Sequence, residues 1–407
     1  MMKNFLKETK ELIFSQGSIA VISILQVSFT AKILGPSNYG IIALYLAITA
    51  TIFRLLSSRN SDLVLLYAEK DKRIQINNFF KLETILGLTS FVLVIITIGI
   101  LDDFLSLNFN QYSVVIFTFV FSRIFTNYAE VFKGYFTHIG NLKLYSYFES
   151  GTVVIRFLLV ITFLIFNPTV EMYFLAISTY SIFSGVVSIF FVKKYYHFQL
   201  DSKIQFNEFF KLIKNSFIKL RIDQAIGVIP SNLDILIIGY YLNSFDVGVY
   251  QFAKKLLEPV NYMYAAFSPW MLNKLKQDIS FKFNFLTTKV LIPISALLTL
   301  TYFFGGEILI STLGSNEFLN AYQPMLIMLL GYLFFFLTFW TRHFLLIKDS
   351  ILSHTIARLM NTLTFLITSV FLISQFSLAG AAIAVSLGIF VQKTMELRAV
   401  NKLRKSS

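Results

Sequence analysis

The sequence predicts an all-α polytopic membrane protein, with about twelve transmembrane helices in two pseudo-symmetric six-helix lobes. Of the 407 residues, 56% are hydrophobic and only 14% are charged. Soluble domains carry about 25% charged residues, and a soluble chain this poor in charge would expose large apolar patches. Runs of about 20 apolar residues, the length that crosses a bilayer, recur along the whole chain.

The apolar runs predict helices, because unpaired backbone groups are too costly in lipid. Runs such as Phe91–Leu101 lack the alternating pattern of membrane β-strands. In chain order, the expected spans are residues 12–33, 39–57, 82–101, 112–132, 147–166, 172–192, 220–240, 248–270, 285–304, 322–345, 353–375 and 377–396.

The distribution of Lys and Arg predicts how these spans are oriented. One set of connecting segments contains acidic residues but no Lys or Arg: 34–38, 102–111, 167–171, 241–247, 305–321 and 374–379. The opposite set is basic, as at Lys193 and Lys194. Cytoplasmic loops carry an excess of Lys and Arg. Both termini are therefore expected in the cytoplasm, and the first span, which lacks a small-residue cleavage site, is expected to remain in the protein.

The longest cytoplasmic segment divides the chain into predicted domains. These are a six-helix lobe at 1–192, a linker at 193–219, and a second six-helix lobe at 220–407 that ends in a basic cytoplasmic tail. Within the linker, Phe206, Phe209 and Ile213 alternate with Lys and Glu. This pattern is typical of an amphipathic helix at the membrane interface.

A short internal repeat supports two related halves. The turn after the first span reads Leu34–Ile41, and the turn after the seventh span reads Leu242–Val249. Each has a Leu followed six positions later by a Gly, at Gly40 and Gly248. Both turns are expected on the outer side, so we interpret the halves as parallel repeats related by an axis along the membrane normal.

Several cations fall inside the predicted spans, where charge is costly and usually faces a bundle interior or an aqueous cavity. Arg123 and Arg156 sit near mid-span and are expected to face a lumen. For four other cations, a lumen-facing position and snorkelling to the interface are both open: Arg54, Lys254, Lys255 and Arg358. Snorkelling is expected for Lys32, Arg221, Lys289, Arg342 and Lys393.

Polar residues three and four positions apart accompany these cations and share a helix face. One stripe runs from Arg123 to Glu130, and another from Glu149 to Arg156. Such stripes on several spans predict a central hydrophilic cavity. Interhelical hydrogen bonding is an alternative explanation, and pairing of Glu130 with Arg123 or of Glu149 with Arg156 would weaken the positive field.

A cavity rich in Arg and Lys suits an anionic passenger, because guanidinium binds phosphate and carboxylate in a forked geometry. The four His residues lack a metal-ligand spacing, there is no Cys, and no phosphate-binding Gly-rich loop occurs. The chain is therefore expected not to be an enzyme and to need no cofactor or metal. Its net charge is +13. The basic residues lie between apolar spans, which argues against nucleic acid as a partner.

Two stretches carry a resemblance to a known family. The segment Ala31–Gly40, and Asp234–Gly239 followed by Val247–Tyr250, resemble the Wzx-type polysaccharide or O-antigen flippases of the multidrug/oligosaccharidyl-lipid/polysaccharide superfamily. The resemblance implies alternating access in the bacterial cytoplasmic (inner) membrane. It also implies transfer of undecaprenyl-pyrophosphate-linked oligosaccharide from the cytoplasmic to the periplasmic leaflet, for lipopolysaccharide O-antigen or another surface polysaccharide.

The resemblance also suggests ion coupling, which Asp223, Asp234 and Glu258 could serve unless they are salt-bridge partners. Beyond membrane lipid and the lipid-linked substrate, it makes a polysaccharide polymerase and a chain-length regulator the expected partners. Two alternatives stay open. A drug or cation exporter of the same superfamily would favour an acidic lumen, and an O-antigen polymerase would carry a large outer loop with basic residues.

Overall fold

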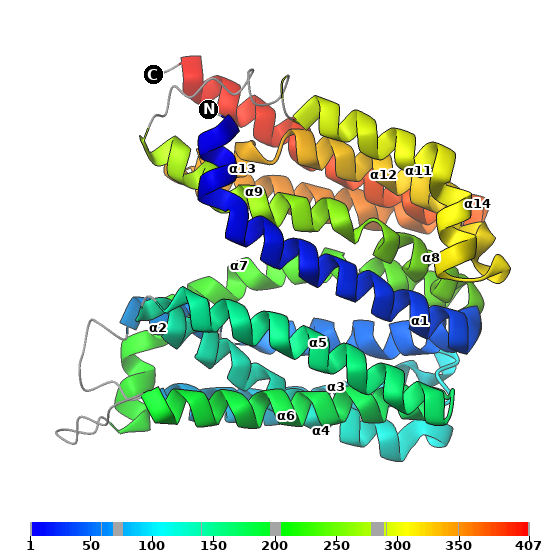
Figure 1. Cartoon of the computed structure of the whole chain (residues 1–407), viewed down its shortest axis with the longest axis horizontal. Helices are drawn as coiled ribbons and strands as arrows, with labels where there is room; N and C mark the ends of the chain where they lie inside the picture. Colours follow the sequence, from blue (N-terminus) through cyan, green and yellow to red (C-terminus); the bar gives the residue numbers. More distant parts are fainter. Residues whose placement is uncertain are drawn as a thin grey trace. The chain divides into compact units, whose positions relative to one another are not determined.

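The computed structural model describes residues 2–57, 59–67, 76–139, 141–195, 205–277, 289, 291–348 and 350–405, and these residues form helices and short connections without any strand. Figure 1 shows the helices in sequence colours. Their bounds are α1 Met2–Leu56, α2 Asn60–Tyr67, α3 Ile76–Leu105, α4 Phe109–His138, α5 Leu142–Phe166, α6 Val170–Tyr195, α7 Phe206–Tyr241, α8 Ser244–Leu256, α9 Glu258–Gln277, α11 Ile292–Leu313, the 3₁₀ helix η2 Asn316–Ala321, α12 Tyr322–Leu337, α13 Trp340–Ile347 and α14 Ile351–Lys405.

The all-α membrane fold class is confirmed. Eight helical segments of the described chain are long and apolar enough to cross a membrane. Two of them, Gly17–Val64 and Leu352–Arg404, each contain two of the predicted spans. The predicted spans at 220–240 and 248–270 correspond to α7, α8 and α9, which are not among these eight segments of the described residues. The count of twelve therefore stays a prediction.

Two kinks explain why four predicted spans appear as two long helices. In α1 the backbone turns at Gly35, whose φ of 72° and ψ of 170° suit glycine. In α14 it turns at Ser377, with φ 49° and ψ −127°. Pro36 follows Gly35 directly and starts the next helical turn without needing a backbone N–H partner. Each kink lies within a predicted outer turn.

Some predicted boundaries are wrong. The ninth span was placed at 285–304, but α11 runs from Ile292 to Leu313, so Glu307 lies in a helix and not in the outer loop assigned to 305–321. The eighth span breaks at Leu257 into α8 and α9. Pro259 is the second residue of α9, a position in the first helical turn that needs no N–H donor.

The chain forms two compact units whose bounds differ from those of the predicted lobes. The terminal unit combines Met1–Ala43 with Leu233–Ser407, and the central unit comprises Leu44–Asn232. Both α1 and α7 contribute residues to each unit. The first predicted span thus belongs with the C-terminal helices, and the beginning of the seventh with the N-terminal ones. The lobes as functional bodies remain a prediction.

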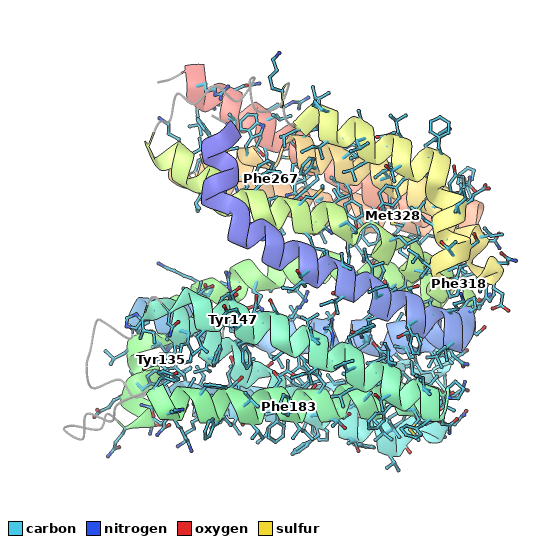
Figure 2. The ribbon with its side chains drawn as sticks, in the orientation of Figure 1. Tyr135, Tyr147, Phe183, Phe267, Phe318 and Met328 are labelled. Atoms are coloured by element: carbon cyan, nitrogen blue, oxygen red, sulfur yellow. The ribbon has the colours of Figure 1, made fainter. Side chains whose placement is uncertain are left out.

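The core of the central unit explains the amphipathic pattern around Phe206. Phe209 and Ile213 of α7 are fully buried among side chains of α2, α3 and α4, and the Phe209 ring meets Phe79 edge to face, with centroids 5.0 Å apart. The apolar face expected at the membrane interface is therefore covered by protein. Tyr135, labelled in Figure 2, belongs to this cluster and donates a hydrogen bond to the carbonyl of Tyr195 at 3.0 Å.

The two repeated turns meet in the terminal unit. A Cβ added at Gly40 would overlap the carbonyl oxygen of Ser244, and one added at Gly248 would overlap the carbonyl oxygen of Pro36. Each glycine thus faces the residue four positions before the other glycine. This reciprocal contact is the arrangement expected of two equivalent repeats, and it accounts for a glycine at both sites.

Candidate functional site

Three arginines gather in the central unit. Arg54 lies in the last turn of α1, Arg123 near the middle of α4 and Arg156 near the middle of α5. Both Arg54 and Arg156 lie within electrostatic range of Arg123. Arg54 is exposed, while Arg123 and Arg156 are half-buried. We call Arg54, Arg123 and Arg156 the arginine cluster.

Two tyrosines of α6 border the arginine cluster. The guanidinium of Arg156 lies over the ring of Tyr180, 5.9 Å from its centroid, which is a cation–π contact. Tyr173 is buried and interacts electrostatically with both Arg123 and Arg156. Tyr180 thus holds the long side chain of Arg156 beside an aromatic surface.

The acidic residues of the same helices are engaged elsewhere. Lys133 Nζ lies 3.3 Å from Glu130 Oε1 and 2.8 Å from Glu149 Oε1. The structure therefore pairs both carboxylates with one lysine, whereas the sequence had left pairing with Arg123 and Arg156 open. The reason is helical spacing, since Lys133 lies one turn beyond Glu130 on α4 and faces the start of α5. The positive charge of the arginine cluster is kept apart from these carboxylates.

The candidate lysines of the terminal unit are ion-paired. Lys254 Nζ lies 2.7 Å from Asp234 Oδ2, and the hydroxyl of Tyr250 donates to the same oxygen at 3.2 Å. Lys255 Nζ lies 2.5 Å from Glu258 Oε1. Asp234 is 2% exposed, so its charge is stabilised by buried partners and not by water.

The other predicted residues are less informative. Arg358 is half-buried on α14 and lies within electrostatic range of Lys393. Asp223 belongs to α7, but its side chain lies outside the described ones. Lys32 and Arg342 are exposed, which is compatible with the snorkelling expected for them.

The sequence pattern did not predict a buried group of charged side chains around Glu396. Lys393 was expected to snorkel, and this is wrong, because it is only 1% exposed and lies 2.8 Å from Glu396 Oε2. His354 Nδ1 contacts Oε1 of the same carboxylate at 2.9 Å. The spacing of Gln392, Lys393 and Glu396 on one helix face was the available signal. Their meeting with His354 depends on the fold-back of α14, which the sequence pattern alone does not specify.

The arginine cluster is the part of the described chain best suited to hold an anion. Like charges at close range repel and gain from a bound anion, and guanidinium groups offer paired donors to phosphate oxygens. In the terminal unit, by contrast, Asp234 and Glu258 already neutralise Lys254 and Lys255. Among the described side chains, no group of three or more His, Cys, Asp or Glu is arranged to hold a metal ion.

Residues 5–269 match the family described as polysaccharide biosynthesis protein. The chain belongs to this family. The matched region contains the arginine cluster, both repeated turns, and the ion pairs of Asp234 and Glu258. The comparison with curated proteins gives no match.

The fold of this chain is similar to that of several solved membrane transporters. It is similar to the lipid II flippase MurJ in an inward closed conformation, with TM-score 0.78, 15% identity, and coverage of 96% of this chain and 87% of that one. It is also similar to an inward-facing multidrug resistance MATE family transporter of the MOP superfamily, with TM-score 0.75, 13% identity, and coverage of 97% and 99%. A mutant of the Vibrio cholerae MATE transporter VcmN gives TM-score 0.58, 12% identity, and coverage of 100% and 97%. At these identities, the likeness establishes the fold.

Proposed function

We propose that this protein is a flippase. Its substrate is an undecaprenyl-pyrophosphate-linked oligosaccharide, which it moves from the cytoplasmic to the periplasmic leaflet by exposing its binding site to each side in turn. The delivered oligosaccharide is used to synthesise O-antigen or another surface polysaccharide. The protein then resides in the bacterial inner membrane with both termini in the cytoplasm, and a polymerase and a chain-length regulator use what it delivers.

The arginine cluster is the observation that carries this proposal. A pyrophosphate linker presents several anionic oxygens, and such a group gains from more than one guanidinium. Within a membrane span, arginines are costly unless they serve a pathway or a partner. Tyr180, which is half-buried, adds aromatic surface next to the cluster, and this suits the sugar that follows the pyrophosphate.

A multidrug or cation exporter is the second candidate, because the fold is also that of MATE transporters. A cationic drug requires carboxylates that are available to it. The described candidate carboxylates are each engaged by a lysine: Asp234 by Lys254, Glu258 by Lys255, and Glu130 and Glu149 by Lys133. This pattern favours the anionic substrate.

A leaflet assay in the host tests the proposal. Deletion of the gene is expected to leave the lipid-linked oligosaccharide on the cytoplasmic face, and its restoration is expected to return the oligosaccharide to the periplasmic face. Delivery of single, unpolymerised units to the periplasm in the deletion strain would instead identify a polymerase. Unchanged delivery together with greater drug sensitivity would support the exporter.

Substitutions in the arginine cluster test the binding site itself. Arg123→Ala and Arg156→Ala are each expected to slow flipping about tenfold or more, because one charge-assisted contact to phosphate is worth about 1.5–3 kcal/mol. The measurement is flipping of a fluorescent lipid-linked oligosaccharide in liposomes, followed with a membrane-impermeant quencher. Arg398→Ala removes an exposed arginine of α14 and is the matched control. Full activity of both cluster variants would contradict the cationic site.

A further inference from the structure

A cavity of about 450 Å³ opens in the terminal unit, where α8, α11, η2, the start of α12 and the bend of α14 meet. Figure 1 shows these elements at one end of that unit. The volume is within the range of about 300–1,000 Å³ that is usual for small-molecule sites. We call this cavity the acidic pocket. Six of its lining side chains, which together come from all five elements, are Asp246, Glu307, Asn320, Tyr322, Gln323 and Phe376.

The acidic pocket lies where three predicted outer segments of the terminal unit come together. These are 241–247, 305–321 and 374–379, and each of them contributes to the lining. None of the three contains a Lys or an Arg. With the orientation predicted from the basic residues, the acidic pocket opens on the periplasmic side.

Two carboxylates give the acidic pocket its negative charge. Neither Asp246 nor Glu307 forms an ion pair with a described residue, and no Lys, Arg or His lines the pocket. Burial raises the pKa of the Asp246 carboxyl, and a hydrogen bond with the Asn243 side chain opposes this shift only in part. The carboxylate of Asp246 is therefore partly withdrawn from water and gains from further hydrogen-bond donors.

The ring of Tyr322 forms a fixed wall beside Glu307. A Cβ added at Gly306 would lie 2.8 Å from Cε2 of Tyr322, so this ring packs closely against α11 one residue before Glu307. The Tyr322 hydroxyl donates a hydrogen bond to the carbonyl of Phe303 at 2.7 Å. Close packing and this hydrogen bond hold the ring in one orientation.

Amide and aromatic side chains complete the acidic pocket. Phe318, labelled in Figure 2, fixes η2, because its fully buried ring lies against Phe252 of α8 with the centroids 4.6 Å apart. Asn320 of η2 and Gln323 of α12 are both exposed, and no described residue pairs with either amide. Phe376, at the bend of α14, is 54% exposed. The donors and acceptors of both amides and the face of this ring are thus available to a ligand.

This set of groups suits a sugar. Sugar hydroxyls both donate and accept hydrogen bonds, so they can use carboxylates and side-chain amides at once. A sugar ring also has an apolar face of C–H groups, which packs on an aromatic ring such as that of Phe376. Because the lining is acidic and contains no cation, it repels phosphate groups and acidic sugars. It favours sugars that are neutral or carry an amine.

Two other classes of ligand fit less well. A metal ion needs several ligands close together, and among the side chains that the structure describes no group of three or more His, Cys, Asp or Glu is arranged to hold one. A hydrophobic drug cation needs walls that are mostly apolar and aromatic. Here two carboxylates and two exposed amides share the lining with the aromatic rings.

We propose that the acidic pocket binds a neutral or amine-bearing sugar of the oligosaccharide that the flippase delivers to the periplasmic leaflet. The site accepts the sugar part of the substrate and excludes its pyrophosphate. The origin of this sugar rests on the proposed flippase function, whereas the sugar site itself rests on the geometry and charge of the pocket.

Binding of free oligosaccharide tests the sugar site without any transport. The probe is radiolabelled oligosaccharide released from the host's lipid carrier by mild acid, and equilibrium dialysis against the purified protein in detergent measures its binding. Asp246→Asn and Glu307→Gln are each expected to weaken binding about tenfold, because each removes a charged hydrogen-bond acceptor. Phe376→Ala should also weaken binding, through the loss of aromatic surface. Inorganic pyrophosphate should not compete with the probe.

Glu317→Gln is the matched control. Glu317 is an exposed carboxylate of η2 that does not line the acidic pocket, so this variant should bind the probe as the unsubstituted protein does. Equal unfolding temperatures in detergent show that the variants are folded. Unchanged binding in both Asp246→Asn and Glu307→Gln, or no binding by the unsubstituted protein, would overturn the sugar site. Glu307-dependent binding of tetraphenylphosphonium in place of the oligosaccharide would also overturn it and favour a drug cation.

Flipping in liposomes separates this site from the proposed function. Glu307→Gln is expected to slow flipping of the lipid-linked oligosaccharide, whereas Glu317→Gln is not. Flipping by a protein that binds no free oligosaccharide would keep the flippase and overturn the sugar site. Glu307-dependent binding without any flipping would support the sugar site and contradict the flippase.

Discussion

Lys133 determines the charge of the candidate site, although it was not itself a candidate. By binding both Glu130 and Glu149, it holds two carboxylates about two helical turns away from Arg123 and Arg156. Helix-face periodicity had instead offered Arg123 as a possible partner of Glu130, and Arg156 as a possible partner of Glu149. The separation leaves a positive end and an acidic end on the same pair of helices, α4 and α5.

Replacement of Lys133 by Met should therefore change both stability and function. It leaves two half-buried carboxylates without their shared cation, and we expect a loss of about 1–2 kcal/mol, since these groups are partly exposed to solvent. Thermal unfolding in detergent measures this. Lys133→Met/Glu149→Gln should recover part of the loss, and an unfolding temperature unchanged by Lys133→Met would show that the pairs contribute nothing.

The pair of Lys254 with Asp234 is more deeply buried and gives a sharper test. Asp234→Asn leaves the ammonium group without its anion, and we expect destabilisation of about 3 kcal/mol. Lys254→Met alone should have a similar effect, whereas the double variant should be less destabilised than the sum of the two single ones. Additive effects of the two substitutions in thermal unfolding would contradict a direct ion pair.

Helix-face periodicity predicts the placement of a residue on one helix but not which residues of two helices meet, and the lumen-facing role of Arg123 and Arg156 stays a prediction. The mid-span positions of Arg123 and Arg156 predicted cations away from the interface, and the structure brings them together with Arg54. Glu396 sits near the predicted end of its span, where a charge is unremarkable. Only the pairing of both halves of α14 reveals that it is buried against His354.

At the scale of elements, the two repeated turns are among the most tightly packed parts of the described chain. Gly40→Ala places a methyl group against the backbone of Ser244, and Gly248→Ala places one against the backbone of Pro36. Backbone atoms cannot rotate away as a side chain can. Each substitution must therefore push the two turns apart.

We expect each of these substitutions to destabilise the protein by about 3 kcal/mol, at the upper end of ordinary overpacking. Gly305→Ala is the matched control, because nothing lies within 4 Å of the added Cβ and alanine is the better helix former. It should be neutral or slightly stabilising. The measurement is the unfolding temperature of each of the three variants in detergent. An unfolding temperature unchanged by Gly40→Ala would mean that the turns do not pack as described.

Element boundaries were predicted less well than element types, for identifiable reasons. Apolar runs specify helices but not where a helix continues through a polar turn, so the helical residues around Gly35 and Ser377 were taken for loops. The amphipathic pattern at Phe206–Ile213 was correct as a helix face. Whether lipid or protein covers such a face depends on tertiary packing, and here α3 and α4 cover it.

At the scale of the whole molecule, the predicted orientation and the twelve spans depend on α7, α8 and α9. These helices are not among the eight apolar segments of the described residues, and they contain the ion pairs of Asp234 and Glu258. A charged pair that is buried within a unit raises the polarity of its helix without exposing that charge to lipid. A helix that contains such a pair can therefore still cross a membrane.

The absence of Cys in the natural sequence makes the topology directly testable by single cysteines. Tyr241→Cys lies at the end of α7, in the predicted outer segment 241–247, and Asn108→Cys lies in the predicted outer segment 102–111 between α3 and α4. We expect a membrane-impermeant maleimide to label both from the periplasmic side. Lys194→Cys and Lys402→Cys, both exposed and predicted to be cytoplasmic, should react only after the membrane is permeabilised. Periplasmic labelling of Asn108→Cys with protection of Tyr241→Cys would show that α7 does not cross, which would reduce the number of spans and remove the equivalence of the two repeated turns.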